Sequence, residues 1–324
     1  MKVLIADKFE KVGIDGLKEL GCTVVSQPDL KAEALPAAIR ETDPHILIVR
    51  STKVTADALK AGAALTLVIR AGAGIDTIDV AAATRLGIFV ANCPGKNSIA
   101  VAELVLGLLI SLDRRIADQV ADLRRGEWLK SEYSKARGLY GRTLGIVGFG
   151  QIGREVASRA QAFGMKIVAC SLDLTREEAD RLGIGYCETP LEVAGLSDAV
   201  SINVAGGADT KHLVNAEFLA AMKPGACLIN ASRGSVVDEV ALEQAVRERG
   251  IRAGLDVYQG EPSAGKAEFK PALASAPGVY GTHHVGASTD QAQVAIALDV
   301  VRIVAEFSES GTAPNCVNQQ ARRP

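Results

Sequence analysis

Three short segments of this 324-residue chain carry side chains suited to binding an anion and moving a proton. The segment NASRG at residues 230–234 presents Arg233, whose planar guanidinium suits a carboxylate held by two parallel hydrogen bonds. Glu261 lies in a second segment, and His283 and His284, two of the four histidines, lie in a third. A histidine beside a carboxylate has a raised pKa and holds a proton near neutral pH. These residues predict an acid–base pair near an anion clamp, with either His283 or His284 as its histidine.

The pattern GxGxxG, typical of dinucleotide binding, is formed by Gly148, Gly150 and Gly153. It follows an apolar strand candidate that ends at Val147, and it opens a helical pattern. The first glycine permits a tight turn, the second lets the backbone approach a pyrophosphate, and the third allows close helix–strand packing. Gln151 and Ile152 begin the helix, where free N–H groups and the helix dipole favour an anion. The segment therefore predicts a bound dinucleotide.

The next strand candidate, residues 166–170, bears on the choice between NAD and NADP, because an acidic residue that binds the ribose is expected at its end. Here the strand ends in Ser171, and the acid is displaced by two positions to Asp173. Ser171 can still hydrogen-bond a ribose hydroxyl. A missing carboxylate also tolerates a 2′-phosphate, but Asp173 would repel one. The sequence therefore favours NAD and does not exclude NADP.

Strand and helix candidates alternate along the chain in two series. A long helix from about residue 98 to 112 follows the first series, and an amphipathic helix over 290–307 follows the second. Repeated β-α-β alternation with short loops predicts parallel, doubly wound sheets. The two long helices are natural connectors, so we expect a domain of residues 99–287 inserted into one built from residues 1–98 and 288–324.

Composition narrows the classes of function. Lys+Arg 36 against Asp+Glu 38 leaves a net charge of −2, which argues against nucleic-acid or anionic-membrane partners. With 32 glycines and only 4% aromatic residues, the chain suits helices packed closely on a parallel sheet. The apolar run 99–110 is too short to span a membrane, and it suits either the core or a subunit interface. The six cysteines lack metal-ligand spacing, which predicts reduced, mostly buried thiols and no metal site. Because no signal peptide is evident either, we expect a cytoplasmic location.

Four motifs resemble the D-isomer-specific 2-hydroxyacid dehydrogenase family: GIVGFGQIG (145–153), NASRG (230–234), GLDVYQGEP (254–262) and THHVGAST (282–289). The resemblance covers nearly the whole chain and implies an α/β protein of two Rossmann-like domains. A cofactor domain is inserted into a flavodoxin-like substrate domain, and the protein is a homodimer or homotetramer. The implied activity is hydride transfer between NAD and a small-molecule D-2-hydroxy acid.

The segments VRSTKVT (49–55), RAGAGIDTIDVAAATRLGI (70–88) and NSIAVAE (97–103) resemble the branch of the family that oxidises 3-phospho-D-glycerate. Reduction of glyoxylate, hydroxypyruvate or pyruvate is the alternative within the family. A dinucleotide-sensing binding protein without turnover is the alternative from another class. Because the chain ends shortly after Asn318, we expect no C-terminal regulatory domain.

The resemblance also assigns roles to single residues. Arg233 would hold the substrate carboxylate and carbonyl, His284 rather than His283 would be the acid–base group, and Glu261 would be its partner. The further cofactor contacts implied are Ala231, Asp256 beside the nicotinamide amide, and Gly286. The substrate contacts implied are the backbone of Ala73 and Gly74 at the carboxylate, and Arg50 and Ser51 at the far end.

Three positions depart from the family pattern. His283 stands where the family often has proline, and Ser171 stands where it has an acid. Residues 203–210 replace a usual Pro-Leu-Thr pattern.

Overall fold

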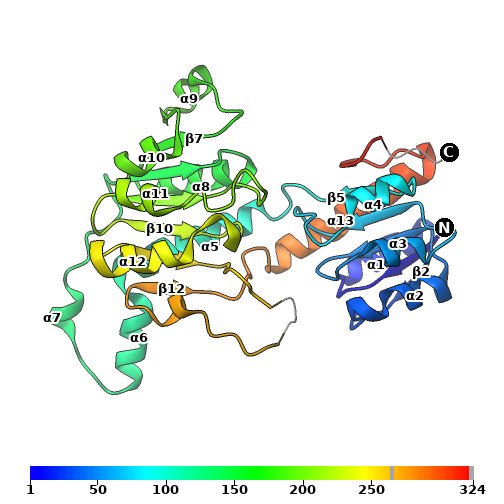
Figure 1. The fold of residues 1–324 in the computed structure, drawn as a ribbon, viewed down its shortest axis with the longest axis horizontal. Coiled ribbons are helices and arrows are strands. Elements are labelled where there is room, and N and C mark those ends of the chain that lie inside the picture. The colour runs from blue at the N-terminus through cyan, green and yellow to red at the C-terminus, as the bar shows by residue number, and fades with distance from the viewer. Residues whose placement is uncertain (263–265, 321–324) are drawn as a thin grey trace. The chain divides into compact units, whose positions relative to one another are not determined.

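A computed structural model of the chain describes residues 1–262 and 266–320. The chain divides into two compact units, one of Met1–Asn97 with Ser288–Pro324 and one of Ser98–Ala287 (Figure 1). Residues 321–324, which belong to the expected first domain, lie outside the described residues. Each unit holds one parallel sheet covered by helices, which confirms the predicted α/β fold class of two doubly wound domains.

The first unit has a five-stranded sheet in the order β2-β1-β3-β4-β5, with all pairs parallel. This is the flavodoxin-like order, whose switch point lies between β1 and β3. The strands are β1 (Lys2–Ile5), β2 (Thr23–Ser26), β3 (Ile46–Val49), β4 (Leu67–Arg70) and β5 (Phe89–Asn92). The helices are α1 (Lys11–Glu19), α2 (Leu35–Thr42), α3 (Ala56–Lys60), α4 (Val80–Arg85) and α13 (Asp290–Ser310), with a short 3₁₀ turn η1 (Ala32–Ala34).

Helices cover both faces of this first sheet. α1 and α13 pack on one face and α2, α3 and α4 on the other, which explains why β3 is buried along its whole length. Helix α13 runs three residues beyond the expected end at residue 307. The C-terminal segment then returns to the edge strand β5, where Oδ1 of Asn318 accepts a 2.7 Å hydrogen bond from the Val90 N–H.

The second unit has a seven-stranded sheet in the order β12-β11-β10-β9-β6-β7-β8, again with all pairs parallel. The strand order reverses between β6 and β9, as in a Rossmann fold. The strands are β6 (Thr143–Val147), β7 (Lys166–Cys170), β8 (Gly185–Tyr186), β9 (Ala199–Ile202), β10 (Cys227–Asn230), β11 (Arg252–Leu255) and β12 (Val279–Gly281). The helices are α5 (Ser98–Arg114), α6 (Ile116–Arg124), α7 (Lys130–Tyr133), α8 (Gln151–Ala162), α9 (Arg176–Leu182), α10 (Pro190–Leu196), α11 (Ala216–Ala221) and α12 (Glu239–Arg249), with 3₁₀ turns η2 (Gly234–Val236) and η3 (Ala272–Ser275).

Helices α5 and α8 pack on one face of the second sheet, and α10, α11 and α12 pack on the other. Most of the apolar run 99–110 is core, although Ile99 is 51% exposed. Helices α6 and α7 lie at one margin of this unit (Figure 1), and the sequence pattern did not indicate them.

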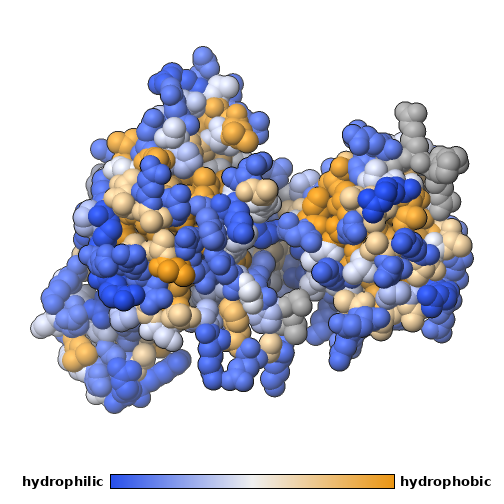
Figure 2. Space-filling model, viewed as in Figure 1, coloured by the Kyte–Doolittle hydropathy of each residue, from blue (hydrophilic) through white to orange (hydrophobic). Residues whose placement is uncertain are grey.

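Hydrophobic residues gather on part of the visible face of the first unit, and hydrophilic residues mix with hydrophobic ones over the second (Figure 2). All six cysteines are free thiols, and five of them are buried, as predicted. Burial raises the pKa of Cys93 and of Cys170 to about 12, so these two thiols stay protonated near neutral pH. No helix among the described residues is long and apolar enough to cross a membrane.

Candidate active site

The turn after β6 has a backbone that only glycine can follow. Gly148 has φ +92°, and a Cβ atom there would lie 2.8 Å from the Asn203 carbonyl carbon, at the end of β9. A Cβ atom on Gly153 would lie 2.3 Å from the carbonyl oxygen of Gly148. The turn is therefore pressed against the β6–β9 switch point, and α8 lies directly on it.

The same turn fits a pyrophosphate. Gly150 is exposed, and a Cβ atom added to it would meet nothing within 4 Å, so a ligand has room at its backbone. Gly150 is also the N-cap of α8, and no side chain caps that end. The five helices that follow are all capped by a side chain, from Thr175, Thr189, Asn215, Asp238 and Thr289. The first N–H groups of α8, including those of Gln151 and Ile152, therefore lack a side-chain acceptor and suit an anion.

The end of β7 provides the candidate ribose contact. Ser171 is half-buried there, while Leu172 and Asp173 are exposed. Two nearby arginines have acidic partners: an Arg154 Nη2 atom lies 2.9 Å from Glu178 Oε1, and Arg176 pairs with Glu188 at 3.6 Å. An uncharged hydroxyl beside an exposed carboxylate thus marks this end of the site.

Arg233 follows β10 in a loop built around the buried residue Asn230. The Asn230 amide donates a 2.9 Å hydrogen bond to the Arg233 carbonyl oxygen, and its Oδ1 accepts from the N–H and hydroxyl of Ser232. Nη1 of Arg233 donates to the Ser232 carbonyl oxygen at 2.7 Å. These contacts fix the backbone of half-buried Ala231 and hold the half-buried guanidinium at the carboxyl edge of the sheet.

His284 and Glu261 form a direct pair. His284 Nδ1 contacts Glu261 Oε1, and Glu261 Oε2 accepts a 3.0 Å hydrogen bond from the Tyr258 N–H. His284 has φ +52°, a left-handed backbone conformation that is uncommon outside glycine. Its side chain is half exposed, so the other ring nitrogen is available to a ligand. His283, next to it, is exposed.

Each member of this pair changes the pKa of the other. The hydrogen bond to Glu261 raises the pKa of His284 above its usual value, against the opposing effects of burial and of Arg233. Burial acts to raise the pKa of Glu261, but the His284 and Tyr258 hydrogen bonds outweigh it and lower that pKa. Between the lowered pKa of Glu261 and the raised pKa of His284, the pair consists of a charged carboxylate and a protonated imidazole. This pH range is wider than it would be for the two isolated groups.

Replacing Glu261 by glutamine is expected to move this range to lower pH. Because a charged partner stabilises the imidazolium, its loss should lower the pKa of His284. A reaction in which His284 accepts a proton needs the neutral imidazole, so the low-pH limb of its rate profile should move to lower pH. A reaction in which His284 donates a proton needs the protonated imidazole and should lose activity at a lower pH than in the parent. The pH profiles of kcat/KM in both directions measure this, and an unmoved or rising limb would exclude Glu261 as the partner.

Asp256 organises the loop that carries His284. It is only 1% exposed, and its Oδ1 accepts from the Thr282 hydroxyl at 2.6 Å and the Val285 N–H at 2.9 Å. Its Oδ2 accepts from the Gly286 N–H at 2.8 Å, and its carbonyl oxygen accepts from the His284 N–H. Asp256 and Gly286 therefore bind each other, and their predicted contacts with a cofactor stay a prediction.

The substrate contacts expected in the first unit follow β3 and β4. Asp7, after β1, accepts hydrogen bonds from the N–H groups of Arg50, Ser51 and Thr52 and from the Ser51 hydroxyl. The Ser51 hydroxyl therefore already has an acceptor, whereas burial lowers the pKa of the Arg50 guanidinium against the nearby charges of Asp7 and Glu10. Ala73 and Gly74 are half-buried, and the Ala73 carbonyl oxygen accepts from Asn92 Nδ2 at 2.6 Å.

Sequence reasoning missed three residues at these sheet edges: Asp7, Arg70 and Glu239. Arg70 ends β4, and its guanidinium lies against the backbone of Gly72. Its signal was available, because an arginine at a strand end before a glycine-rich loop is the pattern that singled out Arg233. Asp7 and Glu239 gave no local signal, since each acts on a segment at least 20 residues away.

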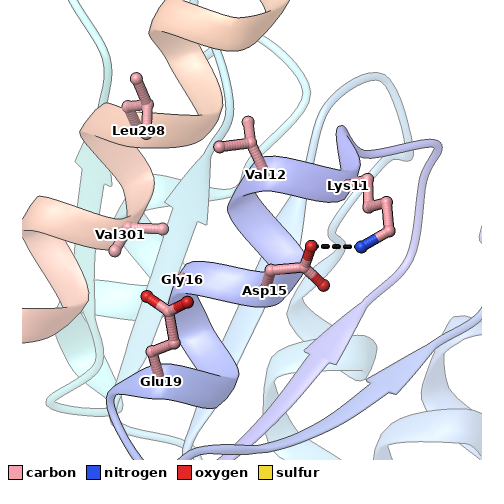
Figure 3. Close-up of a pocket in the computed structure, with 7 residues that line it drawn as sticks. All are labelled: Lys11, Val12, Asp15, Gly16, Glu19, Leu298 and Val301. Carbon is pink, nitrogen blue, oxygen red and sulfur yellow. Dashed lines mark hydrogen bonds and ion pairs between the residues drawn. The ribbon is translucent and has the colours of Figure 1, made fainter.

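The structure thus gathers the predicted residues in two groups. Gly148, Gly150, Ser171, Arg233, Glu261 and His284 follow strands of the second sheet, and Arg50, Ser51, Ala73 and Gly74 follow strands of the first. A groove of about 540 Å³ lies elsewhere, between α1 and α13, lined by Lys11, Val12, Asp15, Gly16, Glu19, Leu298 and Val301 (Figure 3). It holds none of these residues. No cluster of three or more metal-ligating side chains occurs among residues 1–262 and 266–320.

Residues 106–286 match the sequence profile of the D-isomer specific 2-hydroxyacid dehydrogenase, NAD binding domain. The chain belongs to this family. It therefore carries the NAD-binding domain of the D-2-hydroxyacid dehydrogenases, as the motifs predicted.

Relatives of known name agree with this membership. A D-3-phosphoglycerate dehydrogenase of Methanocaldococcus jannaschii is 38% identical over 98% of this chain, and the chain spans 59% of that protein's length. A hydroxypyruvate reductase of Thermotoga maritima is 39% identical over 96% of this chain and 98% of its own length. In structure, an NADPH-dependent glyoxylate/hydroxypyruvate reductase of Sinorhizobium meliloti, in complex with NADP and malonate, has a TM-score of 0.83 at 30% identity and covers 100% of this chain and 98% of its own.

Proposed function

We propose that this chain catalyses the reversible NAD-linked oxidation of a D-2-hydroxy acid, with 3-phospho-D-glycerate and 3-phosphohydroxypyruvate as the substrate pair. The observation that carries this proposal is the His284–Glu261 pair, with the charge of Arg233 acting on both members, in the unit that also holds the pyrophosphate turn. An acid–base group, an anion clamp and a dinucleotide turn are the parts such a reaction needs.

Each residue has one task in this proposal. Arg233 of the second unit binds the substrate carboxylate and polarises the oxygen on C2. The backbone of Ala73 and Gly74 provides substrate contacts from the first unit. His284 accepts the hydroxyl proton on its free ring nitrogen, and Glu261 stabilises the imidazolium through Nδ1. When bound, NAD supplies the acceptor for the C2 hydride. Residues 99–287 form the cofactor domain, and residues 1–98 with 288–324 form the substrate domain.

The choice of a phosphorylated substrate rests on two cations. Arg70 ends β4 in register with Val49 of the neighbouring strand β3, and Arg50 is the residue directly after Val49. Two guanidinium groups suit a phosphate better than the uncharged end of hydroxypyruvate or glyoxylate. Ser51 lies at the same substrate end, where Asp7 accepts hydrogen bonds from its N–H and hydroxyl and so holds the segment that carries Arg50.

Reduction of hydroxypyruvate or glyoxylate is the second candidate, favoured by the relative that matches this chain over 98% of its own length. Steady-state kinetics with NADH and NADPH on phosphohydroxypyruvate, hydroxypyruvate, glyoxylate and pyruvate separate the two. We expect the highest kcat/KM with NADH and phosphohydroxypyruvate. Activity on glyoxylate without activity on phosphohydroxypyruvate would replace the first candidate by the second. Tight NAD binding without any turnover would favour a dinucleotide-sensing protein.

We also propose NAD rather than NADP as the preferred cofactor, because Asp173 is exposed beside Ser171. Replacing Asp173 by asparagine should raise NADP⁺ affinity several-fold without changing NAD⁺ affinity, since a like charge near the 2′-phosphate is removed. Replacing Ser171 by aspartate should have the opposite effect, lowering NADP⁺ affinity about tenfold. Isothermal titration calorimetry measures both constants. Tighter NADP⁺ than NAD⁺ binding by the parent protein would reverse this assignment.

A homodimer or homotetramer is proposed from the margin of the second unit. On α6, Ile116, Val120 and Leu123 lie at helical spacing on one face and are 43%, 41% and 57% exposed, and Trp128 beyond the helix is 78% exposed. Such a face suits a second copy of this chain. We expect light scattering to give at least a dimer, and Leu123→Arg to give monomers that still bind NAD⁺. A monomeric parent protein would exclude the proposal.

A reducing compartment, the cytoplasm, is proposed as the location of the protein, because its cysteines are free and mostly buried thiols.

A further inference from the structure

The peptide bond between Tyr258 and Gln259 is held by two neighbours in the second unit. A Cβ atom on Gly234, the residue after Arg233, would meet the Tyr258 carbonyl carbon at 2.1 Å and the Gln259 nitrogen at 2.6 Å. The Gln259 N–H also donates a 2.6 Å hydrogen bond to Oε1 of Glu239, the first residue of α12. The peptide is thus fixed both by the loop that carries Arg233 and by a carboxylate on a helix.

The position of this peptide decides where Glu261 lies. The Tyr258 N–H donates to Glu261 Oε2 at 3.0 Å, while Oε1 faces His284. The Gln259 side chain adds two contacts, because its Nε2 donates to the Val237 carbonyl oxygen and lies 3.2 Å from His212 Nε2. A displaced peptide would therefore turn the Glu261 carboxylate away from the imidazole that it orients.

Glu239 also brings a second negative charge near the pair. Burial raises its pKa, the Gln259 N–H opposes that rise, and the charge of Glu261 adds to it. Asp256, Arg233 and Glu261 are the charged groups that act on His284. Asp238 caps α12, and its Oδ2 lies 4.0 Å from Nδ1 of His212. Loss of the Glu239 charge makes the potential around Glu261 less negative.

We propose that Glu239 is a positioning residue for proton transfer: it fixes the Tyr258–Gln259 peptide against Gly234 and thereby directs Glu261 toward His284. This inference rests on the proposed function, because it concerns the proton transfer assigned to His284. Glu239 itself touches neither substrate nor cofactor in this scheme, and it neither gives nor takes a proton.

Two substitutions separate its hydrogen bond from its charge. Glu239→Ala removes both, whereas Glu239→Gln keeps an oxygen that accepts from the Gln259 N–H and removes only the charge. Glu243→Ala is the matched control, because Glu243 lies on the same helix and pairs with Arg247, four residues away on the exposed side. Three quantities are measured: kcat, the NAD⁺ dissociation constant, and the titration of His284 by NMR with ¹³C-labelled histidine, assigned with His284→Asn.

For Glu239→Ala we expect kcat to fall about tenfold to a hundredfold, with the NAD⁺ dissociation constant unchanged within twofold. For Glu239→Gln we expect kcat within about threefold of the parent and a His284 midpoint close to that of the parent, because Asp256, Arg233 and Glu261 are the charged groups that act on His284. Glu243→Ala should match the parent in all three.

An unchanged kcat and an unchanged His284 titration in Glu239→Ala would overturn the inference. An equal loss of activity and NAD⁺ affinity would also overturn it, because that pattern marks general damage to the unit. The His284 titration needs no substrate. A parent protein that reduces none of the tested 2-oxo acids would therefore refute the proposed function while the NMR comparison still decides the part played by Glu239.

Discussion

Replacing His284 by asparagine is expected to lower kcat about 10³-fold, with NAD⁺ affinity unchanged. Asparagine is chosen because it tolerates the left-handed backbone at this position (φ +52°) and has no basic nitrogen. The loss should be this large because Glu261 holds the imidazole in one orientation and raises its pKa. The pKa of Glu261 itself is lowered, so its carboxylate cannot replace the imidazole as the proton acceptor.

His283→Asn is the matched control for this experiment. His283 is adjacent and exposed, and the sequence alone did not distinguish it from His284. We expect its kcat to stay within about threefold of the parent, because surface substitutions rarely disturb a neighbouring site. Stopped-flow and steady-state rates with phosphohydroxypyruvate and NADH measure both variants. A severe loss in His283→Asn together with an active His284→Asn would show that His283, and not His284, transfers the proton.

Removing the carboxylate of Asp113 is expected to reduce the free energy of unfolding by about 3–5 kcal/mol, because it leaves a buried guanidinium without its charge partner. The Asp113 and Arg142 side chains are 1% and 8% exposed, and their Oδ1 and Nη1 atoms lie 2.9 Å apart. Oδ2 of Asp113 also accepts from the Gly138 N–H at 2.9 Å. Asp113→Ala therefore detaches α5 from the segment that leads into β6.

Urea unfolding followed by circular dichroism measures this loss, and two further variants interpret it. Glu243→Ala breaks an exposed pair with Arg247 and should cost less than about 1 kcal/mol. The double variant Asp113→Leu with Arg142→Met should regain most of the stability, because an apolar pair of similar size needs no buried charge. A destabilisation of Asp113→Ala no greater than that of Glu243→Ala would show that the buried pair contributes little.

Much of the fold could be predicted from the sequence, because parallel strands that are buried on both faces consist of short runs of consecutive apolar residues. The apolar run at residues 143–147 has the same bounds as β6 in the structure, and the glycines that follow it predicted the turn. Helices α6 and α7 could not be predicted in this way, because exposed apolar residues such as Trp128 do not form a core-facing stripe. Arg70 differs from these helices, because its signal, an arginine at a strand end before a glycine-rich loop, was present in the sequence and was missed.

By itself the sequence predicted a dinucleotide turn at Gly148, an arginine at 233, a glutamate at 261 and an acid–base histidine at 283 or 284. The turn could be predicted because its geometry depends on neighbouring glycines, whereas the pairing of Glu261 with His284 joins segments 23 residues apart. Only the tertiary structure decided how Asp256 and Glu239 act, since each hydrogen-bonds a segment at least 20 residues away. Such contacts depend on which strand ends meet at one edge of the sheet, and strand order is set by packing of the whole unit rather than by any single segment.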